Sequence, residues 1–160
     1  MSRRIPFPCL IPDSSCLITL ERIGQLRLLP AVADDVIVPS AVVSEVGPMP
    51  GWVEIRAVQN EALRRSMHPP LGAGEAEVLA LGLEVDDARV VIDERRARQI
   101  AWRLEIPLVG TLGLLLVAKR EGQLGAVEPA LRALEAAGFL MSEDLRARVL
   151  RRAGEQEGDA

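Results

Sequence analysis

The chain has 160 residues, of which 49% are hydrophobic and 26% charged, so it can form one globular domain with a sizeable core. Two cysteines and one histidine exclude a disulfide framework and argue against a zinc site, which takes about four such ligands. No apolar run reaches the roughly 20 residues of a membrane span and no signal peptide is recognisable, so we expect a cytoplasmic protein without membrane segments.

The net charge of −4 argues mildly against a nucleic-acid partner, because phosphate binding usually leaves a basic footprint. Two features offset this argument. Some of the acids are candidate metal ligands, whose charge a cation would neutralise. Arginine, which contacts phosphate in a bidentate manner, also recurs just after Asp93, at Arg95, Arg96, Arg98 and Arg103. The same arginines are equally consistent with a solvated helix face.

The first half of the chain alternates short apolar runs with amphipathic ones. A strand at residues 10–11 precedes a helix over 16–23, which Ser14 or Ser15 caps and Gly24 ends. The next predicted elements are a short amphipathic piece at 26–29 ended by Pro30, a strand at 36–38, a helix from Pro39 to Gly47, a strand at 52–58, a helix at 60–67 and a linker at 68–72.

The second half continues the alternation. Its predicted elements are a helix at 73–83, a strand at 89–92, a helix at 94–104, a strand at 106–109, a helix at 112–120 capped by Thr111, a helix at 128–137 and a last helix from Ser142 to about Arg152. Strands separated by helices indicate a parallel α/β sheet with right-handed crossovers. We expect a single domain over residues 1–150 and a frayed tail over residues 151–160.

Four acidic residues stand where a strand ends or the next helix begins. Asp13 and Asp93 follow predicted strands, Glu45 lies on the helix after the second strand, and Glu75 opens the helix over 73–83. The carboxyl ends of parallel strands face one crevice, so we expect the four carboxylates to converge there. Four clustered carboxylates repel one another, and a hard cation such as Mg²⁺ or Mn²⁺ among them would offset this repulsion. Such a cluster is typical of enzymes that hydrolyse phosphodiester bonds.

Each acid also has an ordinary structural interpretation when it is taken alone. Asp13 can cap its helix, Glu45 can face solvent, Glu75 can complement the positive end of a helix, and Asp93 with Glu94 can cap the helix that follows. The hypothesis of a shared site therefore depends on all four acids occurring together, each at a strand end or on the following helix of one alternating α/β pattern.

Several segments in a fixed order carry a resemblance to a known family. They are IPDSSCLI at 11–18, VIVPSAVVSEV at 36–46, the segments around Glu75 and Asp93, ARQIA at 97–101 and IPLVGTLGLL at 106–115. Over roughly residues 8 to 150 the chain resembles the PIN-domain family, metal-dependent nucleases that include the toxins of many toxin–antitoxin pairs. The resemblance implies a three-layer α/β/α sandwich with a central parallel sheet.

The resemblance also implies the site, residue by residue. The family's four acids match Asp13, Glu45, Glu75 and Asp93, which would act as both metal ligands and catalytic residues. Two departures stand out. The third acid is usually Asp but is Glu75 here, with Glu77 as a close competitor. Val91 stands where the family often has Thr or Ser.

By the same resemblance we expect a metal-dependent endoribonuclease that cleaves single-stranded RNA with Mg²⁺ or Mn²⁺, the toxin of a toxin–antitoxin pair. A small antitoxin and a second copy of the chain are the expected partners. Apolar helix faces around Leu17, Leu20 and Ile23, or around Leu131 and Leu134, offer a dimer interface, with ordinary core packing as the alternative. Trp52 and Trp102 are expected in the core or an interface.

Two other classes remain open. The first is a catalytically weak or inactive PIN-like protein that binds RNA or a partner without cutting. The second is a phosphate-handling α/β domain. A receiver domain needs a lysine at a strand end, whereas Lys119, the one lysine, lies on a predicted helix. A phosphatase of the haloacid dehalogenase type needs an aspartate where Ser15 stands.

Overall fold

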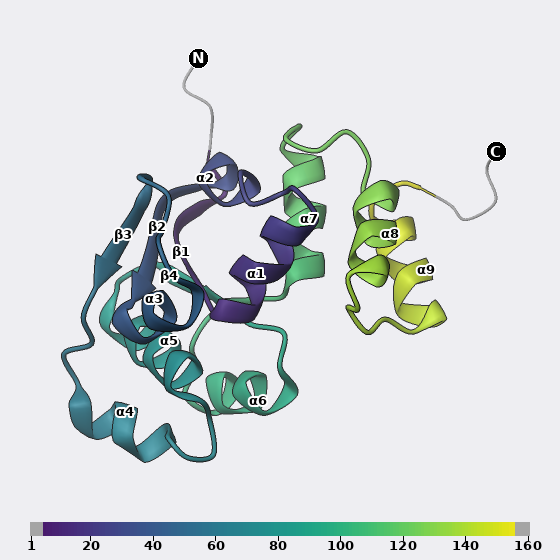
Figure 1. Ribbon diagram of the computed structural model, residues 1–160. Helices are drawn as coiled ribbons and strands as arrows, with labels where there is room; N and C mark the ends of the chain where they lie inside the picture. Colours follow the sequence, from purple (N-terminus) through teal and green to yellow (C-terminus); the bar gives the residue numbers. More distant parts are fainter. Residues whose placement is uncertain (1–4, 156–160) are drawn as a thin grey trace.

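Five parallel strands form the centre of the computed structural model, which describes residues 5–155 (Figure 1). The strands are β1 (Phe7–Pro12), β2 (Ala33–Pro39), β3 (Val53–Arg56), β4 (Ala88–Val91) and β5 (Leu108–Val109), and their order across the sheet is β3-β2-β1-β4-β5. The predicted α/β class and parallel sheet are therefore confirmed.

Helices flank the sheet in the three-layer α/β/α arrangement (Figure 1). They are α1 (Ser14–Arg22), α2 (Leu28–Val32), α3 (Ser40–Val46), α4 (Glu61–Met67), α5 (Ala73–Glu84), α6 (Arg95–Arg103), α7 (Thr111–Arg120), α8 (Glu128–Ala136) and α9 (Glu143–Arg152). Each predicted helix is present, and the boundaries shift by one to three residues in most cases.

Three local predictions about helix ends are wrong. Pro30 lies inside α2 instead of ending the amphipathic piece at 26–29, because its position in the first turn has no intrahelical N–H bond to lose. Asp13, and not Ser14 or Ser15, caps α1. Gly110 takes the N-cap position of α7, which starts at Thr111.

The order of the strands creates a switch point between β1 and β4. The chain moves outward from β1 to β2 and β3, then returns to add β4 on the opposite side of β1. Pro12 and Val91 are paired at the carboxyl ends of these two strands, and the Asp13 N–H donates to the Val91 carbonyl at 3.2 Å. In open α/β sheets the crevice at such a point is where ligands bind.

The core accounts for the apolar helix faces. Leu17, Leu20, Leu131 and Leu134 are each at most 3% exposed, so core packing explains them and the dimer-interface interpretation of these four side chains is wrong. Ile23 is half-buried and packs against the same core. Trp102 is 58% exposed and Trp52 is 37% exposed, so neither belongs to the core.

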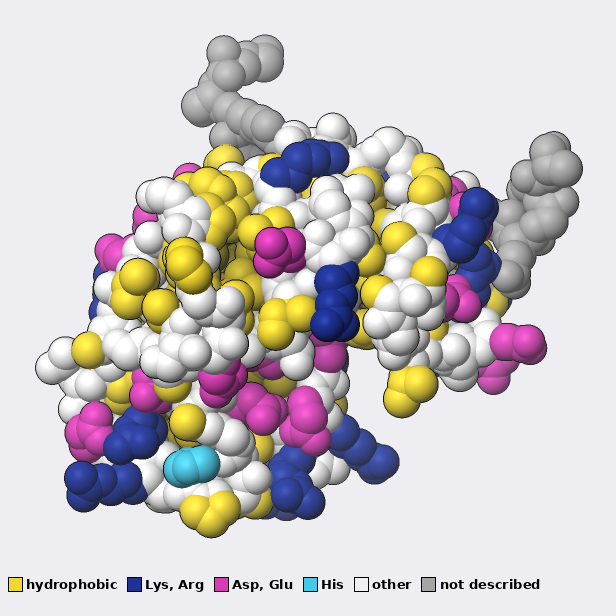
Figure 2. All heavy atoms as spheres, viewed as in Figure 1, with side chains coloured by type: hydrophobic (Ala, Val, Ile, Leu, Met, Phe, Trp, Pro, Cys, Tyr) yellow, Lys and Arg dark blue, Asp and Glu magenta, His cyan; other side chains and the backbone are white. Residues whose placement is uncertain are grey.

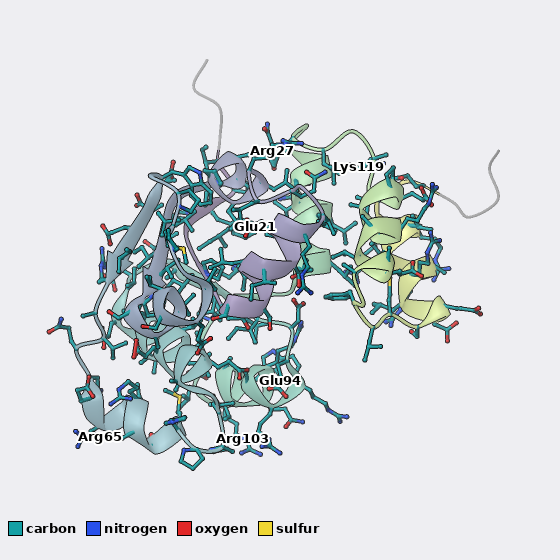
Figure 3. The ribbon with its side chains drawn as sticks, in the orientation of Figure 1. Glu21, Arg27, Arg65, Glu94, Arg103 and Lys119 are labelled. Atoms are coloured by element: carbon teal, nitrogen blue, oxygen red, sulfur yellow. The ribbon has the colours of Figure 1, made fainter. Side chains whose placement is uncertain are left out.

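Helices α8 and α9 form a hairpin that is linked to α7 by a salt bridge. Lys119 on α7 points toward the hairpin (Figure 3), and its Nζ lies 2.7 Å from the Glu155 carboxylate, which also accepts from the Val127 and Glu128 N–H groups. The sequence predicts a tail frayed over 151–160. Arg151 and Arg152 instead belong to α9, and Glu155 is hydrogen-bonded. Residues 156–160 lie outside the described residues. Across residues 5–155, no helix has the length and hydropathy needed to cross a membrane.

Candidate active site

Asp13 lies just beyond the carboxyl end of β1, at the switch point of the sheet. Its backbone is extended, and its Oδ1 accepts from the Cys16 N–H at 2.8 Å, which makes it the N-cap of α1. The side chain is only 3% exposed. The capping role and a place at the crevice are therefore compatible, because the capping bond uses one carboxylate oxygen.

Asp93 stands across the crevice, just beyond β4, and is held by the start of α7. Its Oδ1 accepts from the Thr111 N–H at 2.9 Å, and its Oδ2 accepts from the Thr111 hydroxyl at 2.5 Å. Thr111 is completely buried. A Cβ on Gly110 would lie 2.9 Å from Asp93 Oδ1, so a glycine before α7 leaves room for this carboxylate.

Glu45 on α3 joins three helices at the same edge of the sheet. Its carboxylate accepts from the Ser14 hydroxyl at the start of α1 and from the Gly74 N–H of α5 at 3.0 Å. The expectation that Glu45 lies on the helix after β2 is met, although its side chain is engaged by Ser14 and Gly74 while remaining exposed.

Glu75 occupies the first turn of α5, and one of its oxygens lacks a partner. Its Oε2 is buried, and within the described residues no hydrogen-bond donor reaches it. Burial raises the pKa of Glu75, as do the nearby charges of Glu94 and Glu45, although a backbone N–H bond at Gly72 lowers it. Glu94, labelled in Figure 3, is the N-cap of α6, and its carboxylate accepts from the Ala97 N–H at 2.8 Å.

Glu77, the alternative to Glu75 as the third acid of the site, makes its hydrogen bond to α3. Its Oε1 accepts from the Ala41 N–H at 3.1 Å, at the N-terminus of α3. A carboxylate at this position offsets the positive end of the helix. Glu75 is close enough to Asp13 to raise the pKa of that carboxyl.

The four carboxylates act on one another electrostatically. The pKa of Asp13 is raised from 3.8 to about 7, chiefly because burial disfavours the charged form; the Cys16 N–H opposes the rise, and Asp93, Glu75 and Glu45 add to it. Figure 2 shows acidic side chains gathered in this region, between α3, α5 and α6. The fold thus brings the other three sequence-predicted acids close enough to Asp13 to raise its pKa.

The donor set is suited to a hard cation. In their present positions, no three His, Cys, Asp or Glu side chains of residues 5–155 are grouped closely enough to hold an ion directly. Mg²⁺ usually keeps several waters and takes only one or two carboxylates, so such a tight group is not required. The partnerless Oε2 of Glu75 is the specific observation that fits a cation, because a buried oxygen without a donor is costly unless something binds it.

Three residues that support the carboxylates were not identified from the sequence: Ser14, Gly74 and Thr111. Ser15 is exposed, and the neighbouring Ser14 makes the contact to Glu45. Of these three, only Thr111 could have been suspected from the sequence, because it directly follows a strand and a glycine. The approach of Gly74 to Glu45 depends on how α3 packs on α5.

Gly74→Ala should weaken cation binding without unfolding the protein. A Cβ at this position would lie 2.8 Å from both Glu45 carboxylate oxygens, so the carboxylate must move away. Alanine also favours a helix by about 1 kcal/mol over glycine, which offsets part of the strain. We expect the Mn²⁺ affinity to fall roughly tenfold, the effect of about 1.4 kcal/mol, in a calorimetric titration.

Gly125→Ala is the matched control, because a Cβ there meets nothing within 4 Å. Equal Mn²⁺ affinities for the two variants would show that Glu45 takes no part in the site.

The arginines after Asp93 behave differently from one another. Arg98 is half-buried, donates to the Ile92 carbonyl at 3.4 Å and lies 5.6 Å above the Trp102 ring. It borders the same pocket as Asp93, whereas Arg95, Arg96 and Arg103 are exposed and do not line that pocket. Among these four, Arg98 is the one placed beside the candidate site.

Comparison with known families identifies the fold family of the chain. The family model DUF3368, described as a PIN domain, matches residues 9–155. No curated protein and no solved structure is significantly similar to the chain in sequence. The matched segment contains Asp13, Glu45, Glu75 and Asp93.

Proposed function

The chain belongs to the PIN-domain family, and on this basis we propose that it is an endoribonuclease that hydrolyses single-stranded RNA with Mg²⁺ or Mn²⁺. The observation that carries the proposal is the meeting of four carboxylates at the β1–β4 switch point, with a buried Asp13 and a partnerless oxygen on Glu75. Without a cation, the burial of Asp13 and the repulsion from the neighbouring acids are costly.

Asp13, Glu45, Glu75 and Asp93 would hold the cation, some of them through water. A divalent cation there lowers the pKa of a bound water and offsets the negative charge that builds up on the phosphate. The chain itself supplies orientation: the Cys16 N–H fixes Asp13, and two donors on Thr111 fix Asp93. Asp13 must lose its proton before it can bind a cation, which its pKa of about 7 permits at neutral pH.

The family includes toxins, and a toxin of a toxin–antitoxin pair acting in the cytoplasm is the role we propose. A small antitoxin and a second copy of the chain are the partners proposed with it. Membership of the family supports these points, and the geometry of the carboxylates supports only the chemistry.

One observation favours the alternative, a weak or inactive PIN-like protein that binds RNA or a partner. Glu45 already accepts two hydrogen bonds, from Ser14 and Gly74, and these compete with a cation. The two functions differ in one readout, which is metal-dependent cutting.

The test is incubation of a mixed pool of labelled single-stranded RNA with the protein, with Mn²⁺ and with a chelator. We expect cutting that requires Mn²⁺ and stops in the chelator. No cutting in either arm, under conditions where another PIN nuclease is active, would contradict the nuclease proposal and favour the non-cutting alternative.

A further inference from the structure

A groove opens beside Asp93, between the start of α7 and the α8–α9 hairpin. Its volume is about 500 Å³, within the range of sites that bind small organic molecules. Figure 2 shows the surface hollowed between the part that carries α6 and the hairpin. Asp93 and Gly110 line its inner end, so whatever lies in this α7–α9 groove adjoins the candidate active site.

The groove has an apolar floor and a basic rim. The apolar lining residues come from β5, α7 and the hairpin, and they include Val109, Leu112, Leu116, Phe139, Leu145 and Val149. Arg98 from α6 and Arg148 and Arg152 from α9 also line it, and Asp93 is the one carboxylate among the lining residues. An apolar floor flanked by guanidinium groups is suited to a ligand that is both aromatic and anionic.

Among the described residues, the arginines of the rim have no ion-pair partner within 4 Å. Arg148 and Arg152 are exposed, and within residues 5–155 neither forms an ion pair. Elsewhere on the hairpin, Arg132 pairs with Glu128 at 2.7 Å. The rim therefore offers free charge to an anion at the mouth of the site.

The surroundings of Asp93 are electrostatically asymmetric. On the side of α3 and α5 lie Glu45 and Glu75, and Glu94 is close enough to Glu75 to raise its pKa. A phosphate chain would be repelled in that direction. On the other side lies the groove with its three arginines, so a polyanion that reaches the carboxylates gains most by running along the groove.

We propose that the α7–α9 groove binds the stretch of RNA strand next to the bond that is cut, with a base against the apolar floor and phosphates at Arg98, Arg148 and Arg152. Leu140, 93% exposed beside the groove, provides further apolar surface for a base to cover. The choice of RNA rests on the proposed function. Apolar contact with a base face tolerates any sequence, so the groove sets the position of the strand more than its sequence preference.

The test measures binding separately from cutting. A fluorescently labelled oligouridylate of about a dozen nucleotides is titrated with the protein in a chelator, and fluorescence anisotropy is followed at several salt concentrations. The variants are Arg148→Ala/Arg152→Ala, Leu140→Ser and, as a matched control, Arg151→Ala, which removes an exposed guanidinium outside the groove. Melting curves check that each variant is folded.

We expect Arg148→Ala/Arg152→Ala to raise the Kd roughly 10- to 100-fold and to flatten the dependence of log K on log salt by about 1.4, since each phosphate contact on a single strand contributes about 0.7. Leu140→Ser should raise the Kd a few-fold at an unchanged salt slope, and Arg151→Ala should match the wild type.

Equal Kd values and salt slopes for the double variant and Arg151→Ala would overturn the proposal. It would also be overturned if the double variant binds RNA normally but loses affinity for a polyglutamate peptide, because the groove would then take an acidic protein segment. Loss of RNA binding in the double variant, with no cutting by the wild type in Mn²⁺, would support the groove and contradict the nuclease proposal.

Discussion

Asp93→Asn should abolish Mn²⁺-dependent cutting of single-stranded RNA while leaving the protein folded. The amide can keep its oxygen toward the Thr111 N–H and donate to the Thr111 hydroxyl, so the contacts that orient residue 93 survive. The negative charge is lost, and with it a ligand for the cation. We expect cleavage to slow roughly 100-fold or more, equivalent to about 2.7 kcal/mol of transition-state stabilisation, with a stability change below about 1 kcal/mol.

Asp34→Asn is the control, because Asp34 is exposed near the amino end of β2, at the opposite edge of the sheet from the crevice. Rates are measured under single-turnover conditions for both variants. Cutting by Asp93→Asn at the wild-type rate would remove this residue from the site.

Asp13→Asn should stabilise the protein at pH 8 in a chelator. The folded-state pKa of Asp13 is about 7 against an ordinary value of 3.8, so between these values the native state holds a proton that the unfolded state releases. This group therefore destabilises the native state progressively as the pH rises from about 4 to about 7, by up to about 4 kcal/mol. Asparagine carries no such penalty and remains a good N-cap for α1.

Thermal melts at pH 4 and pH 8 check this prediction. We expect Asp13→Asn to melt up to about 8–16 °C above the wild type at pH 8 and at nearly the same temperature at pH 4, because about 1 kcal/mol shifts the melting temperature by 2–4 °C in a domain of this size. Adding Mn²⁺ should raise the melting temperature of the wild type by mass action, and the variant should lose most of that rise. An equal rise in both proteins would contradict a role for Asp13 in holding the cation.

The fold and the placement of Asp13 and Asp93 just beyond strand ends could be predicted from the sequence because both depend on local pattern. Short β-branched runs bounded by turns and helices define parallel strands, and the acids that follow β1 and β4 must then meet at the switch point. The three-layer architecture came from the resemblance, and the topology confirms it.

The supporting contacts could not be predicted because they depend on packing between distant helices. Ser14 reaches Glu45 across 31 residues, and Thr111 reaches Asp93 across 18. The partnerless oxygen of Glu75 depends on how deeply the start of α5 is buried, which no periodicity encodes. The wrong predictions at Pro30 and at the cap of α1 arose from rules of thumb for helix ends, which leave the choice among neighbouring residues open.

The most direct test of the central claim, that these carboxylates hold a divalent cation, is a calorimetric Mn²⁺ titration of the wild type, Glu75→Gln and Glu77→Gln at pH 7.5. Glu75 Oε2 lacks a partner within the described residues, whereas Glu77 is bonded to the Ala41 N–H. The predicted result is binding by the wild type and by Glu77→Gln, with the affinity of Glu75→Gln reduced at least about tenfold, or about 1.4 kcal/mol. No binding by the wild type, or equal binding by all three proteins, would contradict the proposed centre.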